Sequence, residues 1–158
     1  MTFAANRIAR DIVVAGLAAG TLDMFVAAAI NGLAPGTILQ AIASGLLGRA
    51  AFFGGATSMI IGFVAQEAMS LIIAAIFVLS AQRAPILLRR PLAAGALYGV
   101  AIFVVMNFVV VPLSAAWPRH RHPSAEAIAL NFAAMILFGL IVALAPKILR
   151  QESVLRPG

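Results

Sequence analysis

Apolar residues fill four long runs of the chain, and each run is separated from the next by a short segment that contains Arg, Pro or Gly. A helix needs about 20 mostly apolar residues, at about 1.5 Å each, to cross a bilayer. The runs at 12–33, 56–80, 92–116 and 125–146 meet this requirement. We therefore predict an all-α membrane protein in which four transmembrane helices form a bundle, with residues 1–158 as a single integral membrane domain.

The segment between the first two runs is apolar but does not resemble a spanning helix. Apolar residues recur at helical spacing over about 36–48, yet glycines, Pro35, Gln40 and Arg49 interrupt the segment. This pattern predicts a short helix that lies at the membrane interface. A re-entrant helix that dips into the bilayer is the alternative.

The composition supports a membrane protein. Hydrophobic residues make up 63% of the chain and charged residues 10%, whereas soluble domains are about 45–50% apolar and about 25% charged. The lipid bilayer is thus the first partner that the sequence predicts, and no segment is left over for a separate soluble catalytic domain. The chain has no cysteine, which excludes disulfides and thiolate metal sites.

The basic residues predict the orientation. In a four-span arrangement, Arg49, Arg119 and Arg121 lie on one side of the membrane. Because cytoplasmic loops carry an excess of Lys and Arg, we expect a multi-pass protein of the bacterial inner membrane with both termini in the cytoplasm. The net charge of +6 then reports orientation and attraction to anionic lipid, and we expect no nucleic-acid partner. Eight basic residues lie on the cytoplasmic side: Arg7, Arg10, Arg83, Arg89, Arg90, Lys147, Arg150 and Arg156.

The first run carries a carboxyl group near its middle. Asp23 at the centre of a spanning helix costs roughly 2.5 to 3.5 kcal/mol on insertion scales, so a neighbouring helix must compensate for it. Gly16 and Gly20 form a GxxxG pair on the same helical face as Asp23. We therefore expect this face to pack closely against another helix rather than to face lipid. Gly95 and Gly99 form a second GxxxG pair, in the third run, and predict a second packing surface within the bundle or, less simply, a dimer contact.

Each of the other three runs also contains polar side chains near mid-membrane depth. Gln66 and Glu67 interrupt the second run, Asn107 lies in the third and Asn131 in the fourth. Counted at about 1.5 Å per residue from the cytoplasmic ends, the depths are about 16 Å for Asp23, 20 Å for Glu67 and 22 Å for both asparagines. The sequence therefore predicts an intramembrane polar centre.

Two interpretations of this centre stay open. In the first, Asp23 and Glu67 bind a proton or a cation, and the amide oxygens of Asn107 and Asn131 complete the shell. In the second, the same groups only hydrogen-bond across helices and fix their register, at roughly 0.6 kcal/mol each.

Other motifs predict no chemistry. His120 and His122 have the i, i+2 spacing that can ligate a transition metal, but the adjacent arginines repel cations and two ligands do not make a site. Hydroxyl side chains occur without a base at recognisable spacing, and no catalytic or phosphate-binding motif is present. We expect no enzyme activity, no metal site and no cofactor.

Four blocks carry a resemblance to a known group: AGTLD at 19–23, LQAIASGLLG at 39–48, LRRPLAAGALYGV at 88–100 and VMNFVVVPLSA at 105–115. They are similar to the YagU-like family of small, uncharacterised bacterial inner-membrane proteins. The resemblance implies a four-span inner-membrane protein, with no established activity, substrate or cofactor. It also implies histidines in the second and fourth spans, where this chain has Gln66 and Met135.

Two functional hypotheses follow. In the first, the protein moves or senses a small solute, proton or ion through the polar centre. In the second, it is a non-catalytic structural or accessory subunit that assembles, with itself or with a larger membrane partner, through its small-residue helix faces.

Overall fold

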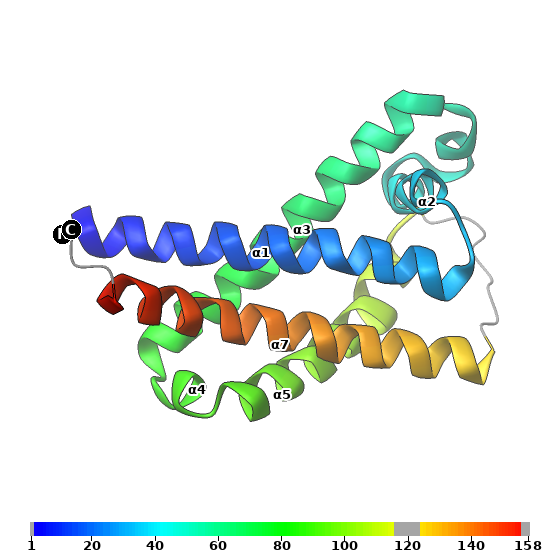
Figure 1. The fold of residues 1–158 in the computed structure, drawn as a ribbon. Coiled ribbons are helices and arrows are strands. Elements are labelled where there is room, and N and C mark those ends of the chain that lie inside the picture. The colour runs from blue at the N-terminus through cyan, green and yellow to red at the C-terminus, as the bar shows by residue number, and fades with distance from the viewer. Residues whose placement is uncertain (1, 116–123, 156–158) are drawn as a thin grey trace.

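The computed structural model describes residues 2–115 and 124–155, with side chains at 5–115 and 124–149, and all of its regular structure is helical (Figure 1). This confirms the all-α fold class. Four of the helices are long. The elements in chain order are α1 (Thr2–Asn31), α2 (Pro35–Leu47), the 3₁₀ helix η1 (Gly48–Phe53), α3 (Gly55–Arg83), α4 (Ile86–Arg89), α5 (Pro91–Val105), the π-helical turn η2 (Met106–Val110), α6 (Val111–Leu113) and α7 (Ala125–Leu155).

Five segments are long and apolar enough to cross a membrane, which makes the chain a polytopic membrane protein by helix length and hydropathy. Four of them contain the four predicted runs in whole or in large part. The fifth, Pro35–Phe53, joins α2 to η1 and has a mean hydropathy of 1.2, against 2.0 or more for the others. The segments are Ala5–Asn31, Pro35–Phe53, Gly55–Arg83, Pro91–Leu113 and Ala125–Leu149.

The long helices alternate in direction. In Figure 1, α1 and α5 run one way and α7 returns between them, while α3 crosses the others obliquely. The start of α1 and the end of α7 lie at the same end of the molecule. In contrast, α2 is seen nearly end-on, so its axis lies across that of α1.

One apolar core joins the four long helices. Its members are mostly small, and alanine lets helix backbones approach closely where the hydrophobic effect contributes little. Phe77 of α3 also stacks obliquely on Tyr98 of α5, at 5.2 Å between ring centroids. The buried core residues are Ala15, Ala19, Ala74, Phe77, Ala81, Ile102, Phe138, Val142 and Ala143.

A second, smaller core holds α2 at the opposite end of α1. Met24 and Ala28 of α1 pack there against Ile38 of α2. The α2 backbone also touches α3, because a Cβ at Gly62 would collide with the carbonyl group of Leu39. This helix is therefore packed onto the bundle rather than detached from it.

Large apolar side chains cover the outer surface. Leu97 and Phe108 are each 73% exposed, and Phe25 is 51% exposed. Soluble monomers rarely expose contiguous apolar surface on this scale, so these side chains indicate contact with lipid.

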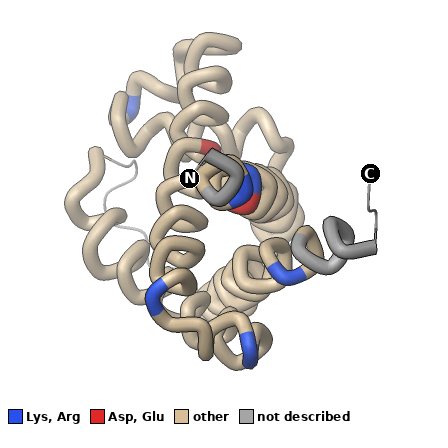
Figure 2. The backbone as a smooth tube through the Cα atoms, turned by 90° about the vertical axis from the view of Figure 1, so that its left-hand side faces the viewer, with Lys and Arg blue, Asp and Glu red and all other residues tan. Residues whose placement is uncertain are grey.

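Figure 2 views the molecule from the end where α1 begins, and Lys and Arg lie there on α1, α7 and the α3–α5 connection. The predicted outer-loop residues Arg119, His120, Arg121 and His122 lie outside the described residues, as does Arg156. The side chain of Arg150 is not described either.

Candidate functional site

The interface between α1 and α3 is close because two glycines of α1 face it. A Cβ at Gly16 would lie 3.0 Å from the Cα of Leu71. A Cβ at Gly20 would lie 3.1 Å from Oε2 of Glu67 and would collide with the side chain of Ser70. Gly16 therefore brings the backbone of α1 against that of α3, and Gly20 brings it against polar side chains of α3.

Glu67 is buried in this interface, with 7% of its surface exposed. The hydroxyl of Thr21 donates a hydrogen bond to Oε1 at 3.1 Å. Within the described residues, Oε2 has no hydrogen-bond partner. A buried carboxyl oxygen without a partner is costly, so packing alone does not account for an acid at this position.

Asp23 lies on the same side of α1 and is held by the neighbour of Glu67. The amide nitrogen of Gln66 donates to Oδ2 of Asp23 at 3.1 Å and to the carbonyl oxygen of Gly20 at 3.3 Å. Each acid thus has its own neutral donor, Thr21 for Glu67 and Gln66 for Asp23. No Lys, Arg or His occurs in the runs 12–33, 56–80, 92–116 and 125–146.

The two asparagines do not join this group in the structure. Asn107 donates from Nδ2 to the carbonyl oxygen of Phe103, four residues earlier in the same chain, at 2.9 Å. Asn131 lies on an exposed face of α7. Helical rise predicts how deep each residue lies along its helix but not its rotation around the helix axis, and rotation decides which side chains meet.

We call Asp23, Gln66, Glu67 and Thr21 the α1–α3 polar cluster. Thr21 was not among the residues that the sequence analysis selected. In the sequence, Thr21 stands in an apolar helix with no sign of a polar partner. Its partner, Glu67, comes next to it only in the folded structure.

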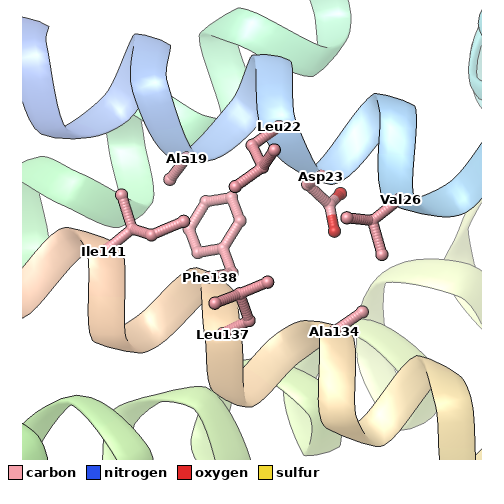
Figure 3. A pocket seen from close by; sticks show the side chains of 8 residues that line it. All are labelled: Ala19, Leu22, Asp23, Val26, Ala134, Leu137, Phe138 and Ile141. Atoms are coloured by element: carbon pink, nitrogen blue, oxygen red, sulfur yellow. The ribbon is translucent and has the colours of Figure 1, made fainter.

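A pocket opens on the other side of Asp23, between α1 and α7 (Figure 3). Its cavity volume is about 10 Å³, close to the minimum that holds one water molecule. In Figure 3 the Asp23 carboxyl points into the space between the two helices, next to Val26. The lining residues are Ala19, Leu22, Asp23, Val26, Ala134, Leu137, Phe138 and Ile141.

The second glycine pair serves a different interface. A Cβ at Gly95 would lie 2.9 Å from the Cα of Leu140 in α7, and one at Gly99 would lie 2.6 Å from the Cα of Ile136. Gly139 of α7 faces both glycines from the opposite side. The sequence carries a signal for this in the small residues Gly139 and Ala143, which are four positions apart.

The structure also bears on metal binding. Among the side chains described at 5–115 and 124–149, no group of three or more His, Cys, Asp or Glu is arranged to hold a metal ion. The two acids of the polar cluster are joined to amide and hydroxyl donors instead. The arrangement can exchange protons and attract a cation, and it lacks the several converging oxygen ligands of a cation cage.

Comparison with known proteins assigns the chain to no family. No protein-family model matches the chain, and neither the curated proteins nor the solved structures contain a significant match. The fold and the site together define a class only, a polytopic α-helical membrane protein with a buried polar cluster between two of its helices.

Proposed function

We propose that four helices, α1, α3, α5 with its extension to Leu113, and α7, cross the membrane, and that α2 lies at the interface. The 13 residues of α2 reach about 20 Å, which is short of a hydrocarbon core about 30 Å thick. At Gly48 the backbone leaves the helix with φ of 58°. An even number of crossings also agrees with the start of α1 and the end of α7 lying at one end (Figure 1).

The same proposal places both termini in the cytoplasm of a bacterium. Six described basic residues belong to the end that α1 and α7 share, whereas Arg49 belongs to η1 near the opposite end. This is the distribution that the positive-inside rule associates with cytoplasmic loops. An inner-membrane location is also what the resemblance to the YagU-like group would imply. The six are Arg7, Arg10, Arg83, Arg89, Arg90 and Lys147.

We further propose that the protein moves or senses a proton or small cation through the α1–α3 polar cluster. The observation that carries this proposal is the buried Oε2 of Glu67, which has no hydrogen-bond partner among the described residues. An acid that only fixed helix register would be expected to satisfy both oxygens. An acid that gains and loses a proton or cation needs one atom available for it.

The accessory-subunit hypothesis has less support. It depends on small-residue helix faces that receive a partner helix. The faces of Gly16 and Gly20 are occupied by α3, and those of Gly95 and Gly99 by α7. We therefore favour a non-catalytic, ligand-responsive function for the chain itself.

Infrared difference spectroscopy of the protein in lipid vesicles tests the proposal. We expect a buried-carboxyl band in the difference spectrum between two pH values, and we expect Asp23→Asn or Glu67→Gln to remove it. Glu126→Gln is the matched control, because Glu126 is an exposed carboxyl near the start of α7. Its removal should leave the buried-carboxyl band unchanged.

Proton flux is the second measurement. Vesicles that contain the wild-type protein are loaded with a pH-sensitive dye and given a pH step. We expect Asp23→Asn and Glu67→Gln to remove the protein-dependent response while expression and folding persist. An unchanged carboxyl spectrum in both variants, together with unchanged flux, would contradict the proposal.

A further inference from the structure

The α3–α5 connection, residues 83–90, carries three arginines: Arg83, Arg89 and Arg90. Because the helices on both sides of it are long and apolar enough to span a bilayer, the connection lies at the membrane boundary. We propose that it binds the headgroup of an anionic phospholipid, with the phosphate on these arginines. This inference goes beyond the proposed function and does not involve the polar cluster.

The charge of the connection is complementary to a phosphate. The side chains of Arg83, Arg89 and Arg90 are exposed. Within the described residues, none of them has a hydrogen bond or an ion pair. The ion pair described at this end of the bundle joins Arg10 to Asp11 on α1, at 3.5 Å. Guanidinium groups present planar sets of donors that match phosphate oxygens, so an anionic headgroup supplies the partner that the described acids do not.

The backbone that carries the arginines is ordered. Pro85 precedes the short helix α4 and Pro91 begins α5, and proline fixes its own φ angle. The N–H of Arg89 donates to the carbonyl oxygen of Pro85 at 3.2 Å, and the N–H of Arg90 donates to that of Ile86 at 3.2 Å. A turn held in this way loses less conformational freedom on binding than a flexible loop does.

Aliphatic side chains lie next to the arginines in the chain. Leu87 and Leu88 pack against the main apolar core and fix the connection to the bundle. In contrast, Ile86 is 56% exposed and Leu92 is 62% exposed. Exposed aliphatic groups at the membrane boundary contact acyl chains, while arginine heads reach the polar layer. The connection therefore fits both parts of a phospholipid, which a soluble phosphate does not have.

Other basic residues at this end of the bundle allow a local site to be distinguished from general attraction. Arg7 of α1 and Lys147 of α7 are also exposed, and Figure 2 shows Lys and Arg on both of these helices. Every basic residue near a membrane surface adds to the attraction for anionic lipid. A site on the connection predicts that its arginines contribute more than Arg7 and Lys147, whereas a diffuse attraction predicts equal contributions.

The experiment titrates the delipidated full-length protein in dodecyl maltoside with dioleoylphosphatidylglycerol and counts bound lipids by native mass spectrometry. Dioleoylphosphatidylcholine is the reference lipid, because it has the same acyl chains and a phosphate whose charge is balanced by choline. We expect one phosphatidylglycerol to bind saturably, at least about tenfold more tightly than phosphatidylcholine.

Two double variants localise the binding. Arg89→Gln with Arg90→Gln removes two charges from the connection and should weaken phosphatidylglycerol binding at least about tenfold. Phosphatidylcholine binding should stay unchanged. Arg7→Gln with Lys147→Gln removes the same charge from the same end of the bundle and should change the affinity less than about twofold, since separated exposed charges are screened. All four side chains are exposed, so both variants should fold.

A soluble competitor separates a lipid site from a phosphate site. sn-Glycerol 3-phosphate carries the phosphate without acyl chains, and we expect a tenfold excess over phosphatidylglycerol to leave the lipid bound. Displacement of the lipid by this compound would assign the arginines to a soluble phosphate and overturn the inference. Equal binding of the two lipids, or equal losses in the two double variants, would also overturn it.

Discussion

The α1–α3 and α5–α7 interfaces both contain glycines four residues apart, but these glycines contact different kinds of atoms. In α5–α7, the glycines of α5 meet the backbone of α7 directly, and the neighbours of Gly99 are main-chain atoms of Met135 and Ile136. In α1–α3, Gly20 meets the side chains of Ser70 and Glu67. Both glycines of α5 therefore meet backbone, whereas in α1–α3 Gly16 meets the backbone of Leu71 and only Gly20 lies against polar side chains.

This difference shows where the molecule can hold a charged group. Direct backbone contact between α5 and α7 leaves no volume for a carboxyl. At α1–α3 the small surface of Gly20 makes room for the Glu67 side chain, and the next turn presents Asp23 to Gln66. We infer that α5–α7 contributes mainly to stability and α1–α3 to function.

The largest expected loss of stability comes from breaking the backbone contact between α5 and α7. Gly99→Leu should lower the free energy of unfolding by about 3 kcal/mol, because overpacking against backbone that cannot move aside is at the upper end of such costs. The measurement is reversible unfolding in mixed micelles of dodecyl maltoside and sodium dodecyl sulfate.

Ala101→Leu is the matched control, since Ala101 is exposed two residues further along α5. It should change the free energy of unfolding by less than about 0.5 kcal/mol. Equal losses in the two variants would show that the α5–α7 contact tolerates a leucine as well as an exposed position of α5 does.

The same substitution, Gly to Ala, can be made in both interfaces, so the cost of one added Cβ can be compared directly. Gly20→Ala should cost about 1 kcal/mol and Gly99→Ala about 2 kcal/mol, because side chains can move aside more easily than backbone. Only Gly20→Ala should also shift the infrared band of the Glu67 carboxyl. A shift caused by Gly99→Ala instead would mean that the two interfaces are coupled.

The sequence predicted the helices and the existence of a polar cluster better than the membership of that cluster. Hydropathy indicates all four long helices, since each must satisfy its backbone within an apolar run. It does not separate the five candidate segments into those that cross and those that do not, because Pro35–Phe53 passes on length and composition alone.

Depth along a helix was a useful guide to Asp23, Gln66 and Glu67, which the structure brings together. It was a poor guide to Asn107 and Asn131. The amide of Asn107 is used within its own helix, and Asn131 is turned to an exposed face of α7. The rotation of each helix follows from how small residues pack between helices. This packing cannot be inferred from the sequence of one helix alone.

Replacing the buried acid by an apolar side chain tests whether Glu67 is retained for function. Glu67→Met should keep the free energy of unfolding within about 1 kcal/mol of wild type or raise it, since well-packed apolar substitutes for buried ionisable groups are often neutral or stabilising. The proton response of loaded vesicles should be lost. A large loss of stability would instead indicate that Glu67 acts as structural glue between α1 and α3.

The smallest loss of stability should come from removing the Thr21 hydroxyl, which donates a hydrogen bond to Glu67. Thr21→Val removes the donor to Oε1 of Glu67 while keeping the branched shape, and interhelical hydrogen bonds in membranes average about 0.6 kcal/mol. The matched control is Thr57→Val, because Thr57 is exposed near the start of α3. Only Thr21→Val should shift the Glu67 carboxyl band, to the higher frequency of a carbonyl that has lost a hydrogen bond. The same band position in both variants would show that Thr21 does not bond to Glu67 in the membrane, and the α1–α3 polar cluster would then reduce to Asp23, Gln66 and a Glu67 without any donor.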